Sequence, residues 1–416
     1  VLGMAPRKSK SSAGPAKMEV DEPKAEPGDI LIMEEERVLN TYDTDSDLAR
    51  LNGGPSSLNN LCQPIKIVMV NEEESGLILE FDMIGVDAPI ANALRRVLIA
   101  EVPSIAIEKI YLYQNTSIIQ DEVLCHRIGL LPIYADPREF DMPSEKVIGI
   151  NENGVDCEEV PPANPNLNLV FNINVACTKN KKAIPAATDP SQLFHNPSVY
   201  SKSFVWQPVG DQEKRFSTDP PRMVHDDILV AKLRPGQEIE ALCYAVKGIG
   251  RDHAKFSPVA TASYRLLPFI KLKKPITGEA AQRLKASFSE GVIEVRENKN
   301  GEEEAFVVDA RRDTSSRNVM RHEDLAPHVE LGKFKKHFIF SVESTGALPA
   351  ATLVAEACSV LEKKAQNLKA LISDALKTTH DPSGHDQDIK ANTTTTSTAK
   401  AGQSAGQNRR MGKKKN

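Results

Sequence analysis

Three short patterns in this 416-residue chain carry residue types that could do chemistry. The first is His225, Asp226 and Asp227, an imidazole beside two carboxylates, which are common metal ligands and acid–base groups. Neighbouring side chains on an extended segment point to opposite faces, so only His225 and Asp227 could converge on one ion or substrate. A structural turn is therefore the favoured interpretation of this pattern.

The other two patterns lack suitable geometry. Cys125 next to His126 suggests a thiolate pair, but neighbouring positions on a helix do not face each other. The Gly-Ile-Gly run at residues 248–250, inside the basic segment 247–255, suggests a phosphate cradle. No third glycine and no helix follow it, and Pro258 intervenes. We expect a loop that contacts solvent or a neighbouring subunit, and we expect no catalytic residue and no cofactor in this chain.

Composition narrows the possible functions further. Hydrophobic residues make up 40% of the chain, which is enough for one large or two modest cores. The formal net charge of −5 and the pI near 6.1 argue against a free-standing nucleic-acid binder, which usually has a basic excess. Aromatic residues, at 5%, are too few for a base-stacking platform.

The cysteines and the apolar runs indicate the compartment. The six cysteines contain no Cys-x-x-Cys pair and are too far apart for a zinc knuckle, so we expect free thiols in a reducing compartment and no bound metal. There is no apolar run near 18 residues and no basic-then-apolar leader. A membrane span and secretion are both disfavoured.

The most informative helix signal lies between Asp87 and Pro103. Asp87 can cap free amide groups, Pro89 sets the φ angle of a first turn, and nothing breaks a helix at residues 89–101. At about 100° per residue, this helix has an apolar face and a mixed face. The mixed face favours contact with a second protein surface, although a solvated face is the alternative. The apolar face carries Ile90, Leu94, Val97 and Leu98, and the mixed face carries Asn92, Arg95, Arg96 and Ile99.

Strands and a second, longer helix are also predicted. Alternating apolar residues predict strands at residues 77–83, 167–175 and 337–343. After Pro349, apolar residues step alternately by four and three as far as residue 376, which predicts a helix with a heptad seam. A helix of about 28 residues is about 42 Å long, which is more than a compact domain needs to cover one face. Part of the seam should therefore pack on another chain.

Two ordered runs of residues resemble the signature of the alpha-like assembly subunits of multisubunit RNA polymerases. The match extends over about 45 ordered positions, so it is far more specific than a five-residue motif. The larger alpha-like subunit shared by eukaryotic polymerases I and III is the best match, because residues 104–262 lack the closely spaced zinc cysteines of the polymerase II counterpart. The runs are Asn92-Ala93-Leu94-Arg95-Arg96 with Ala100-Glu101-Val102-Pro103, and Asp121-Glu122 with His126-Arg127-Ile128-Gly129-Leu130.

The resemblance implies an α+β fold with a discontinuous alpha-like dimerisation domain. This domain would comprise residues 65–103 and 263–380, with a β-rich insert domain at residues 104–262 between its halves. Residues 270–332 are similar to a ferredoxin-like insertion that binds iron–sulfur clusters in some archaeal relatives. This chain has no cysteine there, and thiolates are the required ligands, so the insertion should hold no cluster.

The two ends of the chain have compositions typical of disorder. Residues 1–60 are rich in Ser, Pro, Glu and Asp, so we expect a disordered leader. We expect its apolar patch at residues 30–33 to be solvated, and docking of this patch on a partner is the alternative. From residue 391 onward there is no acidic residue, and residues 381–416 are expected to form a disordered basic tail.

By the same resemblance, the two apolar stripes pack against the matching helices of a smaller alpha-like subunit in an obligate heterodimer. The catalytic metal and the nucleotide would belong to the large catalytic subunits, which the mixed face of the first helix would contact through Asn92, Arg95 and Arg96. The predicted residues of the partner interface are Ile90, Leu94, Val97, Leu98, Val354, Leu361, Leu368 and Ile372.

The resemblance implies a non-catalytic assembly platform for polymerases I and III, which transcribe ribosomal RNA, 5S RNA and transfer RNA. Such a subunit acts in the nucleus, including the nucleolus, meets DNA only through the complex and contacts no membrane. The alternatives are the third-largest subunit of polymerase II or its counterpart in the archaeal polymerase. The alternative of another class is an independent nucleotide-binding enzyme that uses the 247–255 loop.

Overall fold

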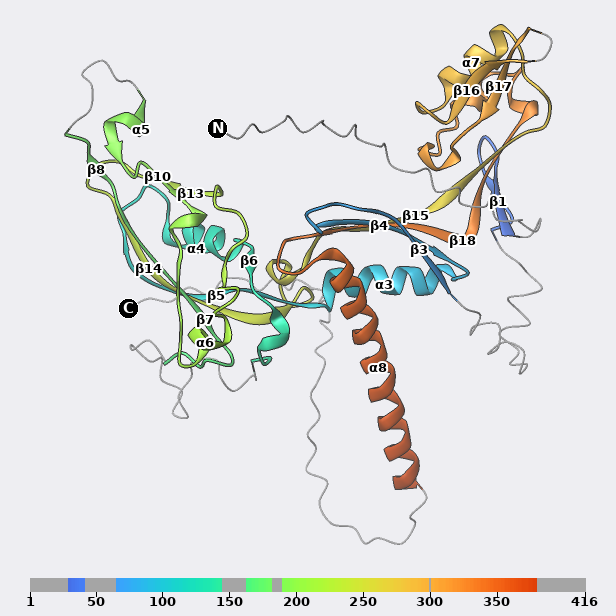
Figure 1. Cartoon of the computed structure of the whole chain (residues 1–416). Coiled ribbons are helices and arrows are strands. Elements are labelled where there is room, and N and C mark those ends of the chain that lie inside the picture. Colours follow the sequence, from blue (N-terminus) through green and yellow to red (C-terminus); the bar gives the residue numbers. More distant parts are fainter. Residues whose placement is uncertain (1–28, 42–64, 144–161, 182–188, 299–300, 380–416) are drawn as a thin grey trace, which may run out of the picture. The chain divides into compact units, whose positions relative to one another are not determined.

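The computed structural model describes residues 29–41, 65–143, 162–181, 189–298 and 301–379 (Figure 1). Within these residues the fold is a mixed α+β one with many strands and few long helices, as predicted. The chain divides into two compact units, residues 1–364 and 365–416, and the boundary falls inside the last helix, α8 (Ala350–Thr379). The predicted basic tail and most of the predicted leader lie outside the described residues.

The largest sheet joins strands from distant parts of the chain. Its order is β2-β1-β18-β4-β3, and β15 also pairs with β18, always antiparallel. Alternation explains its buried face, because Leu79, Phe81 and Met83 lie inward on β4 and the ring of Phe81 stacks on Phe340 of β18 at 5.1 Å. The main strands are β3 (Lys66–Glu72), β4 (Ile78–Ile84), β15 (Val259–Leu272) and β18 (Val329–Ser344).

Two helices supply the rest of this core. Helix α3 (Ala88–Ala100) confirms the predicted helix to within one residue, with Pro89 in its first turn. Asp87 occupies the N-cap position, but its side chain makes no capping hydrogen bond. Helix α8 begins at Ala350, as predicted, and buries Leu353 and Ala357 of its first two turns in the same apolar cluster as α3 and the sheet. We call this cluster the dimerisation-domain core, after the domain that the resemblance predicts at these residues.

A second antiparallel sheet forms the β-rich region, in the order β11-β7-β14-β5. Its strands are β5 (Pro103–Asn115), β7 (Leu169–Ala176), β11 (Val205–Gln207) and β14 (Glu238–Ile249). Its separate core contains Ile107, Phe171 and Cys243, and helix α4 (Asp121–Gly129) covers it through Leu124. Gly129 is the last residue of α4 and has no positive φ angle.

Shorter elements complete the β-rich region. Single turns of helix and short strand pairs connect the long strands. They are β6 (Ile133–Tyr134), β8 (Thr178–Lys179), α5 (Pro190–Leu193), β9 (Phe194–His195), β10 (Ser198–Tyr200), α6 (Gln212–Arg215), β12 (Arg222–Met223) and β13 (Leu229–Lys232).

Residues 270–332 form a small module with a third core. Helix α7 (Glu279–Ser287) packs through Leu284 against β16 (Ile293–Glu297) and β17 (Glu303–Val307), an antiparallel pair. Met33 belongs to this core, because β1 (Ile30–Met33) pairs with β18 and β2 (Val38–Leu39) pairs with β1.

The prediction that residues 30–33 are solvated is therefore wrong. This stretch adds a strand to the sheet, so the predicted leader contains an ordered hairpin at residues 30–39. Gly332 of β18 allows β1 to approach closely, since a Cβ at this position would lie 2.6 Å from the carbonyl oxygen of Leu31.

Candidate partner interface

The apolar stripe on α3 faces its own sheet. Leu94, Val97 and Leu98 are buried, Leu98 completely, in the dimerisation-domain core. Apolar side chains that their own domain covers have little surface left to bury against a second chain. The prediction that these three residues face a partner is corrected: they hold α3 on its sheet. Ile90, which is 39% exposed, is the member of the predicted α3 stripe that remains open.

The seam on α8 changes its surroundings along the helix. Val354 and Leu361 are half-buried and pack against the edge of the dimerisation-domain core. Past residue 364 the apolar side chains are each more than half exposed, and they include the predicted Leu368 and Ile372. The α8 apolar surface, as we call it, consists of Leu368, Leu371, Ile372 and Leu376.

The mixed face of α3 is pre-arranged for polar contacts. The guanidinium of Arg95 donates from Nε and Nη2 to Oδ1 of Asn92, at 3.1 and 2.8 Å. Arg96 is exposed one residue further on, and Ile99 is exposed between the two arginines on the helix surface. These bonds use two of the five N–H donors of Arg95, so its other donors and those of Arg96 can serve acceptors on a second surface.

Two ion pairs orient the first half of α8. The Nζ of Lys364 lies 2.8 Å from each carboxylate oxygen of Glu101, the C-cap residue of α3. Two turns earlier, Oε1 of Glu356 lies 3.7 Å from Nη1 of Arg138 in the β-rich region. Exposed pairs each contribute at most about 1 kcal/mol, so these two add little to the stability of the fold.

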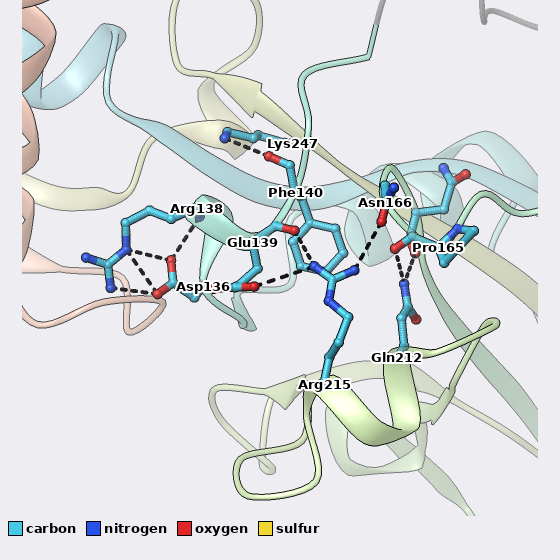
Figure 2. A network of polar contacts seen from close by, with 10 residues as sticks. Asp136, Arg138, Glu139, Phe140, Pro165, Asn166, Gln212, Arg215 and Lys247 are labelled. Atoms are coloured by element: carbon cyan, nitrogen blue, oxygen red, sulfur yellow. Dashed lines mark hydrogen bonds and ion pairs between the residues drawn. The ribbon is translucent and has the colours of Figure 1, made fainter.

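Arg138 belongs to a polar network that fastens loops of the β-rich region together (Figure 2). Its guanidinium donates to both carboxylate oxygens of Asp136, with the shortest distance 2.6 Å. On the other side of the network, Arg215 donates to the carbonyl oxygen of Glu139 at 2.6 Å. The buried Gln212 donates to two carbonyl oxygens of the neighbouring loop, both at 2.8 Å. Arg138, which reaches Glu356 of α8, is therefore held in position by its hydrogen bonds to Asp136.

The lysines of the 247–255 segment are occupied within the chain. The Nζ of Lys247 donates to the carbonyl oxygen of Phe140 at 2.8 Å, and burial lowers the pKa of this lysine. The Nζ of Lys255 donates to the carbonyl oxygen of Ile107 at 2.9 Å and pairs with the carboxylate of Glu108. Both ammonium groups are therefore engaged in contacts within the chain.

Gly250 has a packing role as well. A Cβ at this position would lie 2.2 Å from the carbonyl oxygen of Ile99, at the end of α3. Glycine is required there because the turn between β14 and β15 lies directly against the helix backbone. The Gly-Ile-Gly run therefore packs closely within its own chain, which the sequence did not predict.

The other two chemical patterns lie in different surroundings. Residues 225–227 are exposed in an irregular segment, where a backbone carbonyl accepts a hydrogen bond from the hydroxyl of Ser201. Burial, helped by two acidic residues on the same helix, raises the pKa of Cys125, and burial raises that of Cys243 to about 12. Within the described ranges, no three His, Cys, Asp or Glu side chains are placed to hold a metal ion.

A buried ionic cluster that the sequence did not predict lies on the sheet face opposite the helices. Asp82 of β4 is 1% exposed and accepts hydrogen bonds from Arg311 at 2.7 and 2.8 Å, while its Oδ2 lies 2.9 Å from Nε2 of His337. Burial alone would raise the pKa of Asp82, but the bonds with His337 and Arg311 outweigh it and lower the pKa. Because Arg311 belongs to the 270–332 module, the cluster joins that module to the sheet.

An antiparallel sheet carries two helices, and the second half of one of them leaves its large apolar side chains uncovered, which is typical of a domain that binds another protein. The model of the RNA polymerase Rpb3/Rpb11 dimerisation domain matches residues 80–365. This match covers more than half of the chain, so the chain belongs to the RNA polymerase Rpb3/Rpb11 dimerisation domain family.

Named relatives agree with this assignment. The chain is 50% identical over 300 residues to the DNA-directed RNA polymerases I and III subunit RPAC1 of Mus musculus, covering 72% of this chain and 82% of that protein. It is 46% identical over 289 residues to the subunit of the same name from Saccharomyces cerevisiae, covering 70% and 82%. It is 29% identical over 289 residues to the DNA-directed RNA polymerases II, IV and V subunit 3 of Arabidopsis thaliana, covering 68% and 85%.

No helix in the described part of the chain combines the length and the apolar character that crossing a membrane requires.

Proposed function

We propose that this chain is a non-catalytic assembly subunit of the DNA-directed RNA polymerases I and III. The observation that carries the proposal is the degree of similarity: the two RPAC1 proteins are far more similar to this chain than the polymerase II, IV and V subunit is. The cysteine pattern agrees, since residues 104–262 contain no closely spaced pair that could hold zinc. This assignment also implies a nuclear location, including the nucleolus.

The pairing partner in this proposal is the smaller alpha-like subunit. The α8 apolar surface supports it, because four large aliphatic side chains on one helix half are costly to leave in water. The proposed interface is centred on Leu368 and Ile372, with Ile90 on α3 and the half-buried Val354 and Leu361 at its border. An obligate interface of this type typically buries more than about 2,000 Å² in total.

The large catalytic subunits would meet the mixed face of α3. The hydrogen bonds to Asn92 fix the orientation of the Arg95 guanidinium, and Arg96 and Ile99 lie exposed beside it. A pre-oriented guanidinium can bind a carboxylate or a backbone carbonyl with little further loss of side-chain entropy. DNA would be met only through the assembled complex, in which the large subunits carry the catalytic centre.

Affinity purification of the full chain from its own cells, followed by mass spectrometry, tests the proposal. We expect subunits of polymerases I and III together, in addition to a small alpha-like protein. Recovery of polymerase II subunits alone would move the chain to the other branch of the family. Recovery without any polymerase subunit, combined with nucleotide binding by the isolated chain, would favour the enzyme alternative.

A further inference from the structure

Strand β3 and the residue before it expose apolar side chains at the edge of the largest sheet. Ile65, Ile67 and Met69 recur at every second position, and each is about half exposed. Strand β3 pairs with β4 on one side, and among the described residues no strand pairs with its other side. An open edge strand of this composition promotes unwanted association unless another surface covers it. We call these three residues the β3 strip.

The strand register places the β3 strip on the helix face of the sheet. Ile67 lies opposite Met83, and Met69 lies opposite Phe81. Residues directly opposite each other in an antiparallel pair share one face. Met83 and Phe81 are buried in the dimerisation-domain core, whereas their neighbours on β3 are open. The helix layer of this chain therefore covers β4 and stops before β3.

The β3 strip and the α8 apolar surface are complementary types of surface. The first is the portion of the helix face of the sheet over which the described residues place no helix. The second is part of a helix whose large apolar side chains are exposed past residue 364. Two related subunits that pair about an approximate two-fold axis present the same surfaces to each other. Each subunit then supplies the helix that the other subunit's sheet lacks.

We propose that the β3 strip is the landing site for the long C-terminal helix of the smaller alpha-like partner, a proposal that rests on the function proposed above. The strip is followed by the exposed Glu72 and Glu74, so the helix that lies on it carries basic residues beside its apolar stripe. Strand β3 lies just before the residues that match the family model, 80–365.

Methionine oxidation tests the landing site directly, because an exposed thioether is oxidised much faster than a covered one. The chain offers a matched pair: Met69 is 47% exposed in the β3 strip, and Met142 is 48% exposed in the β-rich region. We expect oxidation of Met69 by hydrogen peroxide to slow at least about fivefold when the purified chain is paired with the smaller subunit. Oxidation of Met142 should keep its rate. Equal rates for Met69 in the free chain and in the heterodimer would overturn the proposal.

Substitutions provide a second test that separates this proposal from the proposed function. Ile67→Glu with Met69→Glu should weaken heterodimer formation at least about tenfold, since two buried apolar contacts are replaced by charges. Ile78→Glu is the matched control, because Ile78 is a partly exposed apolar residue on the opposite face of the same sheet, and it should pair normally.

The outcomes of the two tests are distinguishable. If the Ile67 and Met69 variant pairs like the unmodified chain while substitutions on the α8 apolar surface abolish pairing, the landing site is wrong and the function stands. If the unmodified chain does not pair with the smaller subunit at all, the proposed function fails and the landing site fails with it.

Discussion

The apolar stripe of α3 and that of the second half of α8 have similar spacing and composition, but the first is buried inside the chain and the second is exposed. Length accounts for the difference. Helix α3 has 13 residues and spans about 20 Å, whereas α8 has 30 residues and spans about 45 Å. A helical stripe shows that one face will be buried, but it does not show which chain will bury it.

The largest expected effect comes from the buried stripe. Leu94→Asp places a carboxylate in the dimerisation-domain core, so we expect it to lower the free energy of unfolding by at least about 4 kcal/mol and to abolish pairing as a consequence. Urea denaturation followed by circular dichroism measures the change. A stable, folded variant would show that Leu94 faces outward after all.

The exposed stripe should respond in the opposite manner. Leu368→Asp with Ile372→Asp should change the free energy of unfolding of the isolated chain by less than about 0.5 kcal/mol, because both side chains are in water there. Pairing with the smaller subunit should nevertheless be lost in a co-expression pull-down. Normal pairing would remove the α8 apolar surface from the interface. Lys369→Asp, a charge change within the same turns, is a suitable control.

The buried ionic cluster should be the next most sensitive feature. Asp82→Asn leaves the guanidinium of Arg311 without its counter-charge, which should cost about 3 kcal/mol of unfolding free energy. The folded pKa of Asp82 lies below its unfolded value of about 4, so the carboxylate stabilises the fold above that pH and the contribution is lost as the pH falls through the folded pKa.

Unfolding titrations at neutral pH and at about pH 3 measure this effect, with the variant expected to lose less stability on acidification than the unmodified chain. Identical losses for the two proteins would show that the charge of Asp82 does not stabilise the folded state.

The mixed face of α3 should matter only to the larger assembly. Arg95→Ala with Arg96→Ala should keep the heterodimer, since neither side chain belongs to the dimerisation-domain core. Recruitment of the large subunits should weaken by about tenfold or more, which corresponds to the loss of one charged hydrogen bond. Quantitative mass spectrometry of the purified complex measures the ratio of subunits. Normal stoichiometry would mean that these arginines are simply solvated.

The smallest effect is expected from the ion pair between the two helices. Glu101→Gln removes the charge that Lys364 contacts at 2.8 Å, but the pair is partly exposed, so we expect a loss of less than about 1 kcal/mol. Binding titrations with the smaller subunit should show a correspondingly slight weakening that disappears at high salt. A large loss would indicate that this pair sets the direction of α8 more strictly than its exposure suggests.

The local elements were largely predictable from sequence. The start of α3, the strand that becomes β4 and the beginning of α8 follow from Pro89, from alternation around Phe81 and from Pro349, and each of these predictions is confirmed. Each depends on residues only a few positions apart. The candidate site was less predictable, since the family resemblance assigned both Leu94 and Leu368 to a partner, and only the second is open to one.

Contacts between distant segments account for the remaining differences. The pairing of residues 30–33 with β18 joins segments about 300 positions apart, and Arg311 meets Asp82 across 229 positions. Composition marked the first segment as part of a disordered leader, because four apolar residues cannot form a core alone. The edge of β18 supplies the hydrogen-bonding partner that residues 30–33 lack on their own.

The sequence alone determined the family, the helix α3, the strand β4 and the beginning of α8, and it indicated more apolar surface than one domain needs. All of these depend on residue type and short spacing. Only the tertiary structure decided which apolar side chains the chain buries for itself and which, on α8 and at the β3 edge, it leaves for a partner. That division depends on where a helix layer ends over a sheet, which is set by packing between strands and helices far apart in the sequence.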